Sequence, residues 1–107
     1  MTALLIASQE GHVEVVQLLL EKGADIDVKD KHGRTALQWA SHKGLPEVVR
    51  LLLEKGADIQ AKDNAGTSAL HMASKNGHLE VARLLLEKGI DIEAKTKVSA
   101  LLAVHVG

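Results

Sequence analysis

The chain has 107 residues, of which 46% are hydrophobic and 1% aromatic, and its 13 basic and 14 acidic residues give a formal net charge of -1. The absence of cysteine excludes a disulfide framework and a thiolate metal site, and it agrees with an intracellular location, in the cytoplasm or the nucleus. The near-zero charge and the lack of stacking aromatics argue against a nucleic-acid partner, and no apolar run is long enough to span a membrane.

A sequence unit recurs every 33 residues along the chain. The sequence Leu-Leu-Leu-Glu-Lys-Gly begins at Leu18, Leu51 and Leu84, and glycines, aspartates and Ala-Leu pairs recur in the same register. A unit of this size cannot bury its own apolar face, so neighbouring units are expected to stack around one continuous core. The period divides a single domain, residues 1–107, into units of about 1–33, 34–66 and 67–98 and a partial unit of 99–107.

The middle unit predicts two antiparallel helices. The first covers residues 35–43, with Thr35 as its N-cap and Gly44 as its end. The second begins at Pro46, because the missing N–H of proline costs nothing in a first helical turn. Its valines and leucines spread over a wide arc, which requires packing partners on several sides, and Gly56 ends it.

A projecting arm is expected to follow each second helix. Residues 57–62 alternate between apolar and polar, and this period of two predicts an extended segment. The arm turns at residues 63–66, where Asp63 can accept backbone N–H groups ahead of it and Gly66 can take a positive φ. Each unit is therefore expected to be a helix, a tight turn, an antiparallel helix and a β-hairpin-like arm.

Several segments of these units carry a family pattern: residues 35–40 (TALQWA), 44–49 (GLPEVV) and 51–58 (LLLEKGAD), with their counterparts in the other units and the Asp-x-x-Gly tips. In these segments and in its period the chain resembles the ankyrin repeat family. The resemblance implies a mainly α solenoid of antiparallel helix pairs joined by β-hairpin-like arms. It also implies a non-catalytic function in protein–protein interaction, without a cofactor.

The chain departs from the family's pattern at a few positions. Alanine, as at Ala36, replaces the usual proline, and Leu5 and Gln38 replace a histidine that only His71 keeps. Losing these histidines is expected to remove side-chain to backbone hydrogen bonds that tie the turn together, with modest destabilisation. Ile90 stands where the other units have alanine, so the third unit must make room for a larger side chain.

Both ends of the chain are apolar, at residues 3–7 and 100–106. The first unit has no preceding arm and the sequence stops within the first helix of a fourth unit, so both ends look cut. The last arm, residues 95–99, is two residues shorter than residues 62–68 and lacks Asp and Gly, so a well-formed tip is not expected there. Two interpretations of the apolar ends stay open: they fold back as imperfect caps, or they stack on other copies of the chain or exchange elements with them.

The histidines and serines do not indicate a metal site or a catalytic site. His12 and His78 occupy equivalent positions two periods apart, so they should lie far apart along the stack. Ser8, Ser41 and Ser74 recur once per unit, as a structural position does and a unique nucleophile does not. We therefore expect no enzymatic activity, no metal site and no cofactor.

The arms and the first helices of successive units are expected to form one concave surface, which in ankyrin domains usually contacts the protein partner. Positions on this surface that differ between units, while the scaffold positions repeat, are the candidate binding residues. They are Lys31, His32, Arg34, Trp39, His42, Lys43, Asn64, Thr67, Met72, Lys75 and Asn76.

Trp39 is the only aromatic residue of the chain, and its counterparts one period away are Ile6 and Met72. These three are expected to form an apolar ladder along the first helices. Two interpretations of Trp39 stay open: it packs against neighbouring helices and the roots of the arms, or it contacts a partner directly as a rigid anchor.

The sequence thus favours a non-catalytic protein-binding module with a rigid concave surface. A structural or self-assembling fragment that oligomerises through its apolar ends is the alternative. A third interpretation is a piece that targets a catalytic domain lying elsewhere in a longer protein. The fold indicates a mode of action and no particular partner.

Overall fold

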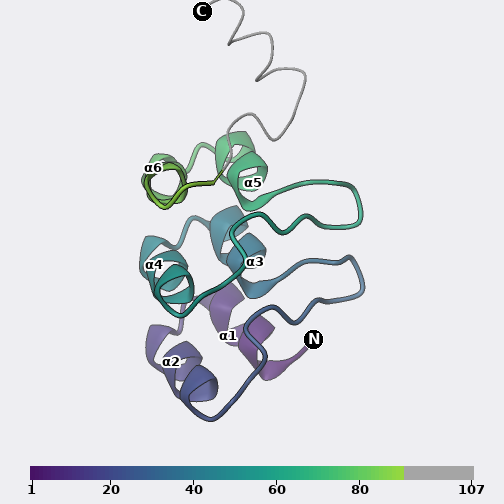
Figure 1. The fold of residues 1–107 in the computed structure, drawn as a ribbon, viewed down its shortest axis with the longest axis vertical. Helices are drawn as coiled ribbons and strands as arrows, with labels where there is room; N and C mark the ends of the chain where they lie inside the picture. The colour runs from purple at the N-terminus through teal and green to yellow at the C-terminus, as the bar shows by residue number, and fades with distance from the viewer. Residues whose placement is uncertain (91–107) are drawn as a thin grey trace, which may run out of the picture.

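The computed structural model describes residues 1–90, and six helices follow one another in this part of the chain (Figure 1). They are α1 (Ala3–Glu10), α2 (Val13–Glu21), α3 (Ala36–Lys43), α4 (Pro46–Glu54), α5 (Ala69–Lys75) and α6 (Leu79–Glu87). The starts of α1, α3 and α5 lie 33 residues apart, and so do those of α2, α4 and α6, which confirms the helix pairs that the period predicts. The last arm and the apolar tail discussed above, residues 95–99 and 100–106, lie outside the described residues.

The helices form two columns (Figure 1). The inner column contains α1, α3 and α5 and lies beside the projecting loops, and the outer column contains α2, α4 and α6. Within the columns α3 packs against α1 and α5, and α4 packs against α2 and α6. The largest fully buried aliphatic side chains come from every helix pair: Leu5, Leu37, Leu52, Leu85, Val16, Val48, Val49 and Val81. One continuous core therefore runs through the stack.

Hydroxyl side chains begin the inner helices. The Oγ atoms of Thr2, Thr35 and Ser68 accept the backbone N–H three residues ahead at 3.2, 3.3 and 3.3 Å. Each of these bonds satisfies one of the N–H groups that a helix start leaves unpaired. Pro46 opens α4 and Gly44 follows α3, as the sequence predicts.

Gln38 stands where the family has a histidine, and we expected this change to remove the side-chain hydrogen bonds that tie the turn together. That expectation is wrong, because Gln38 makes such bonds itself. Its Oε1 atom accepts the N–H of Thr35 at 2.8 Å, which completes a capping box. Its Nε2 atom donates to the carbonyls of Ala61 and Thr67 at 3.1 and 2.9 Å, on both sides of the next arm. The amide thus holds helix and arm together because it can accept and donate at once. Ile90, the other departure, is accommodated with 5% of its surface exposed.

The expected extended segment of the second arm is a turn instead. The Oδ1 atom of Asp58 accepts the N–H of Gln60 at 3.0 Å, and the Asp58 carbonyl accepts the N–H of Ala61 at 3.3 Å. An Asp side chain that bonds two residues ahead favours such a turn over a strand. Among residues 1–90 the only β-bridge is the isolated antiparallel pair of Lys62 and Ser68, so β-hairpin-like arms stay a prediction. The period of two reflects burial, since residues 57–62 alternate between half-buried and exposed.

We predict that Gln38→Leu lowers the free energy of unfolding by about 1–3 kcal/mol, because the Thr35 N–H and the Ala61 carbonyl lose their partner and the Thr67 carbonyl loses one of its two. Gln38→His is the matched control. His71, at the same place in the third unit, accepts the N–H of its own N-cap through Nδ1 at 3.1 Å. The histidine variant should therefore lose less stability in urea unfolding followed by circular dichroism. Equal losses for the two variants would contradict this account of the turn.

A second prediction concerns two equivalent glycines, Gly44 and Gly77, with φ values of 71° and 70°. A Cβ atom at Gly44 would overlap the ring of His78, whereas a Cβ atom at Gly77 would meet nothing within 4 Å. Gly44→Ala and Gly77→Ala share the same left-handed backbone strain. We expect Gly44→Ala to cost about 1 kcal/mol more in urea unfolding of dilute protein, because His78 must move and loses its bond to the His42 carbonyl. Equal costs would show that the ring makes room freely.

Candidate protein-binding surface

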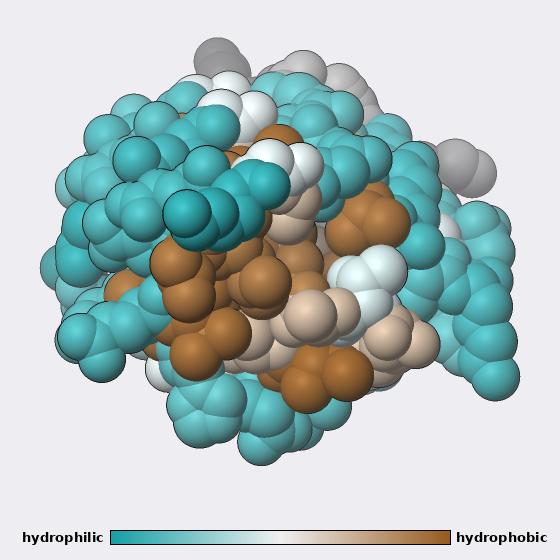
Figure 2. All heavy atoms as spheres, turned by 90° about the horizontal axis from the view of Figure 1, so that it is seen from below, coloured by the Kyte–Doolittle hydropathy of each residue, from teal (hydrophilic) through white to brown (hydrophobic). Residues whose placement is uncertain are grey.

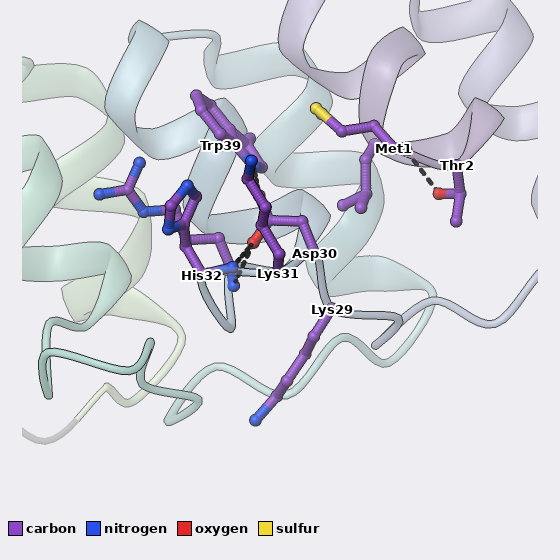
Figure 3. Close-up of a pocket in the computed structure, with 9 residues that line it drawn as sticks. Met1, Thr2, Lys29, Asp30, Lys31, His32 and Trp39 are labelled. Atoms are coloured by element: carbon purple, nitrogen blue, oxygen red, sulfur yellow. Dashed lines mark hydrogen bonds between the residues drawn. The ribbon is translucent and has the colours of Figure 1, made fainter.

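A pocket of about 870 Å³ opens between the first arm and the start of α1 (Figure 3). Four of the predicted binding residues line it: Lys31, His32, Arg34 and Trp39. Five further residues complete the lining: Met1, Thr2, Leu5, Lys29 and Asp30. The structure therefore brings the predicted residues of the first arm together with Trp39 at one place.

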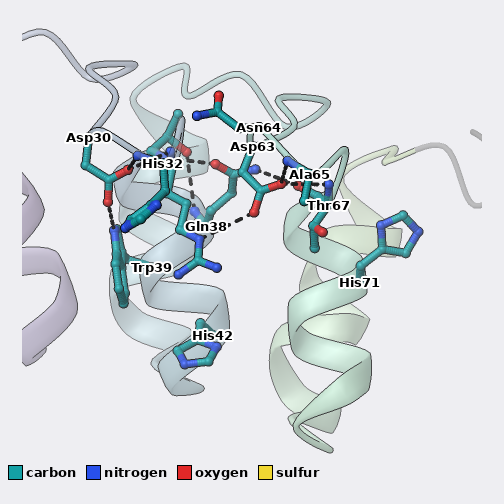
Figure 4. Close-up of polar contacts among 12 residues, drawn as sticks. Asp30, His32, Gln38, Trp39, His42, Asp63, Asn64, Ala65, Thr67 and His71 are labelled. Carbon is teal, nitrogen blue, oxygen red and sulfur yellow. Dashed lines mark hydrogen bonds and ion pairs between the residues drawn. The ribbon is translucent and has the colours of Figure 1, made fainter.

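Asp30 organises this pocket (Figure 4). Its Oδ1 atom accepts the backbone N–H groups of His32 and Arg34 at 2.8 and 3.0 Å, and these bonds shape the tip of the arm. Its Oδ2 atom accepts the indole Nε1–H of Trp39 at 2.9 Å. Both oxygens are engaged, so the carboxylate fixes the indole against the arm.

The environment of Asp30 keeps this carboxyl group ionised. Burial raises the pKa of Asp30, but the hydrogen bonds from the Arg34 N–H, the Trp39 indole and the His32 N–H together outweigh burial and lower it. Donors aimed at a carboxylate favour its charged form. These three hydrogen-bond donors thus stabilise the negative charge of the Asp30 carboxylate.

Arg34 joins the first arm to the second. Its guanidinium carbon lies 5.3 Å from the centre of the Trp39 ring, and its Nε atom lies 3.4 Å from Oδ2 of Asp63. The Oδ1 atom of Asp63 accepts the N–H groups of Ala65 and Thr67, both at 2.9 Å. Burial raises the pKa of Asp63, but these two N–H groups and Arg34 lower it further than burial raises it. The Arg34 side chain is 35% exposed, so this ion pair positions the guanidinium more than it stabilises the fold.

Asn64 and Thr67, which we predicted as binding residues, form hydrogen bonds within the fold. The backbone N–H of Asn64 donates to the His32 carbonyl at 2.9 Å, and its Nδ2 atom donates to the Lys31 carbonyl at 3.2 Å. The Thr67 carbonyl accepts from Gln38, as described above, and from the N–H of Asp63 at 3.0 Å. These two residues hold neighbouring arms and helices in register.

A second polar cluster lies where the inner helices end: His42 is in the last turn of α3, Asn76 follows α5 and His78 precedes α6. The His42 ring meets the Trp39 ring edge-on, with the centres 5.9 Å apart. Asn76 donates through Nδ2 to the His42 carbonyl at 3.2 Å, and its Nδ2 atom lies 3.0 Å from His42 Nδ1. Nδ1 accepts that bond only when it carries no proton, so the contact selects a neutral ring. Lys43 is exposed at the end of α3.

The lysine that ends α5, Lys75, is likewise exposed, but Met72 on the same helix is only 5% exposed. Met72 therefore offers almost no surface to a partner. The predicted apolar ladder is most exposed at its other end, where Ile6 is 50% exposed. Trp39 is half-buried and packs against the core, so the packing interpretation holds for part of its side chain.

Residues 1–90 offer neither a group of metal ligands nor a membrane-spanning helix. In this part of the chain, no three His, Cys, Asp or Glu side chains form a group that could hold a metal ion. None of its helices has both the length and the apolar character needed to cross a membrane.

A comparison with known families decides what the stacked helix pairs represent. The family profile described as ankyrin repeats, in three copies, matches residues 4–96. The chain belongs to the ankyrin repeat family. Ankyrin repeats generally mediate protein–protein interaction, which agrees with the coarse function that the sequence predicts.

A similar protein matches about a third of the chain. The chain is 51% identical over 35 residues to the E3 ubiquitin-protein ligase mind-bomb of Drosophila melanogaster. The aligned part makes up 33% of this ankyrin chain and 3% of that protein. The chain therefore spans only a small part of the relative's length.

Sequence reasoning missed the role of Asp30 in the ankyrin pocket. Asp30 recurs one period later as Asp63, so it was interpreted only as a turn residue. A signal was present, because Trp39 is the one aromatic residue of the chain and a half-buried indole needs an acceptor. Searching the neighbouring arm for a carboxylate would have found Asp30.

We predict that the stability of this ankyrin domain falls as the pH drops through about 6.5. Burial lowers the pKa of His42 below its usual 6.5, and the charges of Arg34, Lys43, His78 and Lys75 lower it further. At pH values between the usual and the lowered pKa, His42 is protonated in the unfolded chain but not in the folded chain. Stability therefore rises with pH across this window and is lost as the pH falls through it.

Urea unfolding between about pH 7.5 and about pH 5.5 measures this dependence. The control is His42→Gln, which keeps an amide near Asn76 but cannot titrate. The variant should show a flatter dependence of stability on pH than the parent chain. The same slope in both proteins would mean that another group is responsible.

Proposed function

We propose that this ankyrin domain is a non-catalytic module that binds another protein through the concave surface of its arms and inner helices. The observation that carries the proposal is the pocket around Trp39, where an indole fixed by Asp30 lies among exposed basic side chains. The contacts that shape this pocket exist before any partner arrives, so little ordering is needed on binding. The absence of cysteine supports an intracellular setting, in the cytoplasm or the nucleus.

The distribution of charge suggests what kind of partner fits. Among the inner helices, α3 and α5 carry Lys43 and Lys75 and no acidic residue, and α1 carries only Glu10, whereas the outer helices carry six glutamates and two arginines. On the arms, Asp30 and Asp63 already use both carboxylate oxygens in hydrogen bonds within the fold. The part of the concave surface formed by the first arm, α3 and α5 therefore presents positive charge, although the chain as a whole is close to neutral.

The complementary partner is an acidic segment that carries an apolar side chain. The apolar side chain would enter the pocket beside Trp39, Leu5 and Met1, where it is removed from water. Neighbouring carboxylates would face Lys31 and Lys43, which are both exposed. Anchoring by an aromatic residue with surrounding charge complementarity is a common pattern at protein interfaces.

The test uses a display library of random peptides selected against the 107-residue chain. Binding is then measured by fluorescence with selected peptides that contain no tryptophan. Because the chain has one Trp and no Tyr or Phe, its emission reports on the pocket alone. We expect selected peptides to combine Asp or Glu with an apolar residue and to change the Trp39 emission.

Charge-reversal pairs make the test specific. Lys31→Glu with Lys43→Glu should weaken peptide binding at least tenfold, which corresponds to about 1.4 kcal/mol or more. Arg50→Glu with Arg83→Glu makes the same change in net charge on exposed outer-helix positions and should leave affinity within about twofold. Selected peptides that bind without affecting Trp39, or equal losses in both variants, would refute the proposed surface.

A further inference from the structure

The polar cluster of His42, Asn76 and His78 lies where the second and third units meet, one helical turn beyond Trp39 along α3. Figure 4 shows His42 and Trp39 on the same helix. The cluster is separate from the end of the stack where α1 and α2 expose aliphatic side chains (Figure 2). α3 packs against α1 on one side and α5 on the other, so described helices flank His42 on both sides.

Two carbonyl groups fix the orientation of the Asn76 side-chain amide. Its Nδ2 atom lies 3.2 Å from the carbonyl oxygen of His42 and 3.1 Å from that of Met72. Carbonyl oxygens only accept hydrogen bonds, so the atom that faces both of them is the NH₂ group and not the amide oxygen. The same Nδ2 atom lies 3.0 Å from Nδ1 of His42. A donor at this position opposes a proton on Nδ1, and the neutral ring therefore carries its proton on Nε2.

The Nε2 atom of His42 is the part of the ring that is left for a ligand. Among residues 1–90 no hydrogen bond reaches this atom, whereas Nδ1 and the backbone carbonyl of the same residue are both engaged. His42 as a whole is half-buried, but its Nε2 atom is not among the buried polar atoms that lack a partner. An acceptor that approaches from solvent can thus bond Nε2–H without displacing a contact of the fold.

Positive charge acts on His42 from several elements. It comes from Arg34 on the first arm, Lys43 on α3, Lys75 at the end of α5 and His78 before α6. In the described part of the chain the one ion pair joins Arg34 to the second arm. The charged residues of the other helices that pack against α3 form no ion pair there: Glu10, Glu47, Arg50 and Glu54. Burial and the four positive groups lower the pKa of His42, so the free domain favours the neutral ring.

We propose that His42 takes up a proton when an acidic segment binds, and that the domain therefore binds such a segment more tightly in acid than at neutral pH. A partner carboxylate accepts the Nε2–H of His42 and supplies a negative charge beside the ring. Nδ1 then takes one proton from solvent and releases the amide of Asn76. This regulation rests on the proposed binding of an acidic segment to the concave surface, in which carboxylates already face the neighbouring Lys43.

Linkage decides the direction of the pH dependence. A bound carboxylate raises the pKa of His42 above its value in the free domain. Affinity therefore rises as the pH falls through the pKa of the complex, and it levels off below the pKa of the free domain. Asp30 and Asp63 do not change charge in this range. Burial raises their pKa values, but the hydrogen bonds that they accept lower them further, to below 3.8.

The first experiment measures peptide affinity through the emission of Trp39 at about pH 7.5 and about pH 5.5. The probe is a selected acidic peptide that contains neither tryptophan nor histidine, so it adds no emission and no imidazole. We expect the parent chain to bind about fivefold more tightly at the lower pH. His42→Gln keeps a polar side chain beside Asn76 but cannot titrate, and its affinity should not rise in acid.

His71→Gln is the matched control. It also replaces a histidine with glutamine, at a position where the second unit already has Gln38 in the same capping box. The variant should therefore keep the parent's gain in affinity at the lower pH. Circular dichroism at both pH values verifies that each variant is folded.

The second experiment follows the imidazole resonances by NMR as the pH is lowered, with and without the peptide. The resonance that disappears in His42→Gln belongs to His42. Its titration midpoint should lie below 6.5 in the free domain. With the peptide, the midpoint should rise by about one pH unit. Asn76→Ala removes the donor that faces Nδ1, so it should raise the midpoint of the free domain and reduce the rise on binding.

Some results would overturn the regulation alone. Equal affinity at both pH values, with Lys31→Glu and Lys43→Glu still weakening binding, would leave the binding surface intact and exclude His42 as its regulator. A gain in acid that persists in His42→Gln, or a midpoint that moves at His32 and not at His42, would assign the proton to another ring.

A different result would overturn the binding function itself. Selection that yields no acidic peptide, or peptides whose affinity does not depend on Lys31 and Lys43, would refute the proposed surface and the regulation with it. The dependence on these lysines at about pH 7.5 therefore tells the two failures apart.

Discussion

The structure depends on one constraint: no helix pair buries its aliphatic residues unless another pair lies next to it. Burial of a Val or Leu side chain is worth about 1.5–3 kcal/mol, and in α4 and α6 the preceding unit makes that burial possible. The constraint also explains the sequence. A valine and a leucine stand at Val48 and Leu51 and recur one period later, because the same neighbour must be met again. Stability is thus a property of interfaces between units, and position in the stack decides how exposed an identical side chain is.

At the tip of each arm, the two carboxylate oxygens of one aspartate have different roles. In both tips, Oδ1 accepts the N–H groups two and four residues ahead, so this oxygen builds the same turn in each unit. Oδ2 is left free by the turn and takes a different partner in each: Trp39 for Asp30, and Arg34 for Asp63. Oδ1 thus fixes the backbone of the turn in the same way in both arms. Oδ2 instead positions a side chain that differs between the arms, Trp39 or Arg34, at the candidate binding pocket. A surface specific to this chain can therefore arise without any change in the backbone of the repeat.

The sequence predicted the period, the helix pairs and the N-caps, because each depends on residues close together in the chain. Prediction from the sequence failed where a side chain bonds to another unit, and where two different structures give the same alternation of apolar and polar residues. Gln38 was expected to weaken its turn, but its amide bonds an arm more than 20 residues away, which propensity does not reveal. The alternation after Asp58 reflected burial and not a strand, since a turn with one side inward gives the same period. Met72 looked like a surface position by analogy with Trp39, yet it is only 5% exposed.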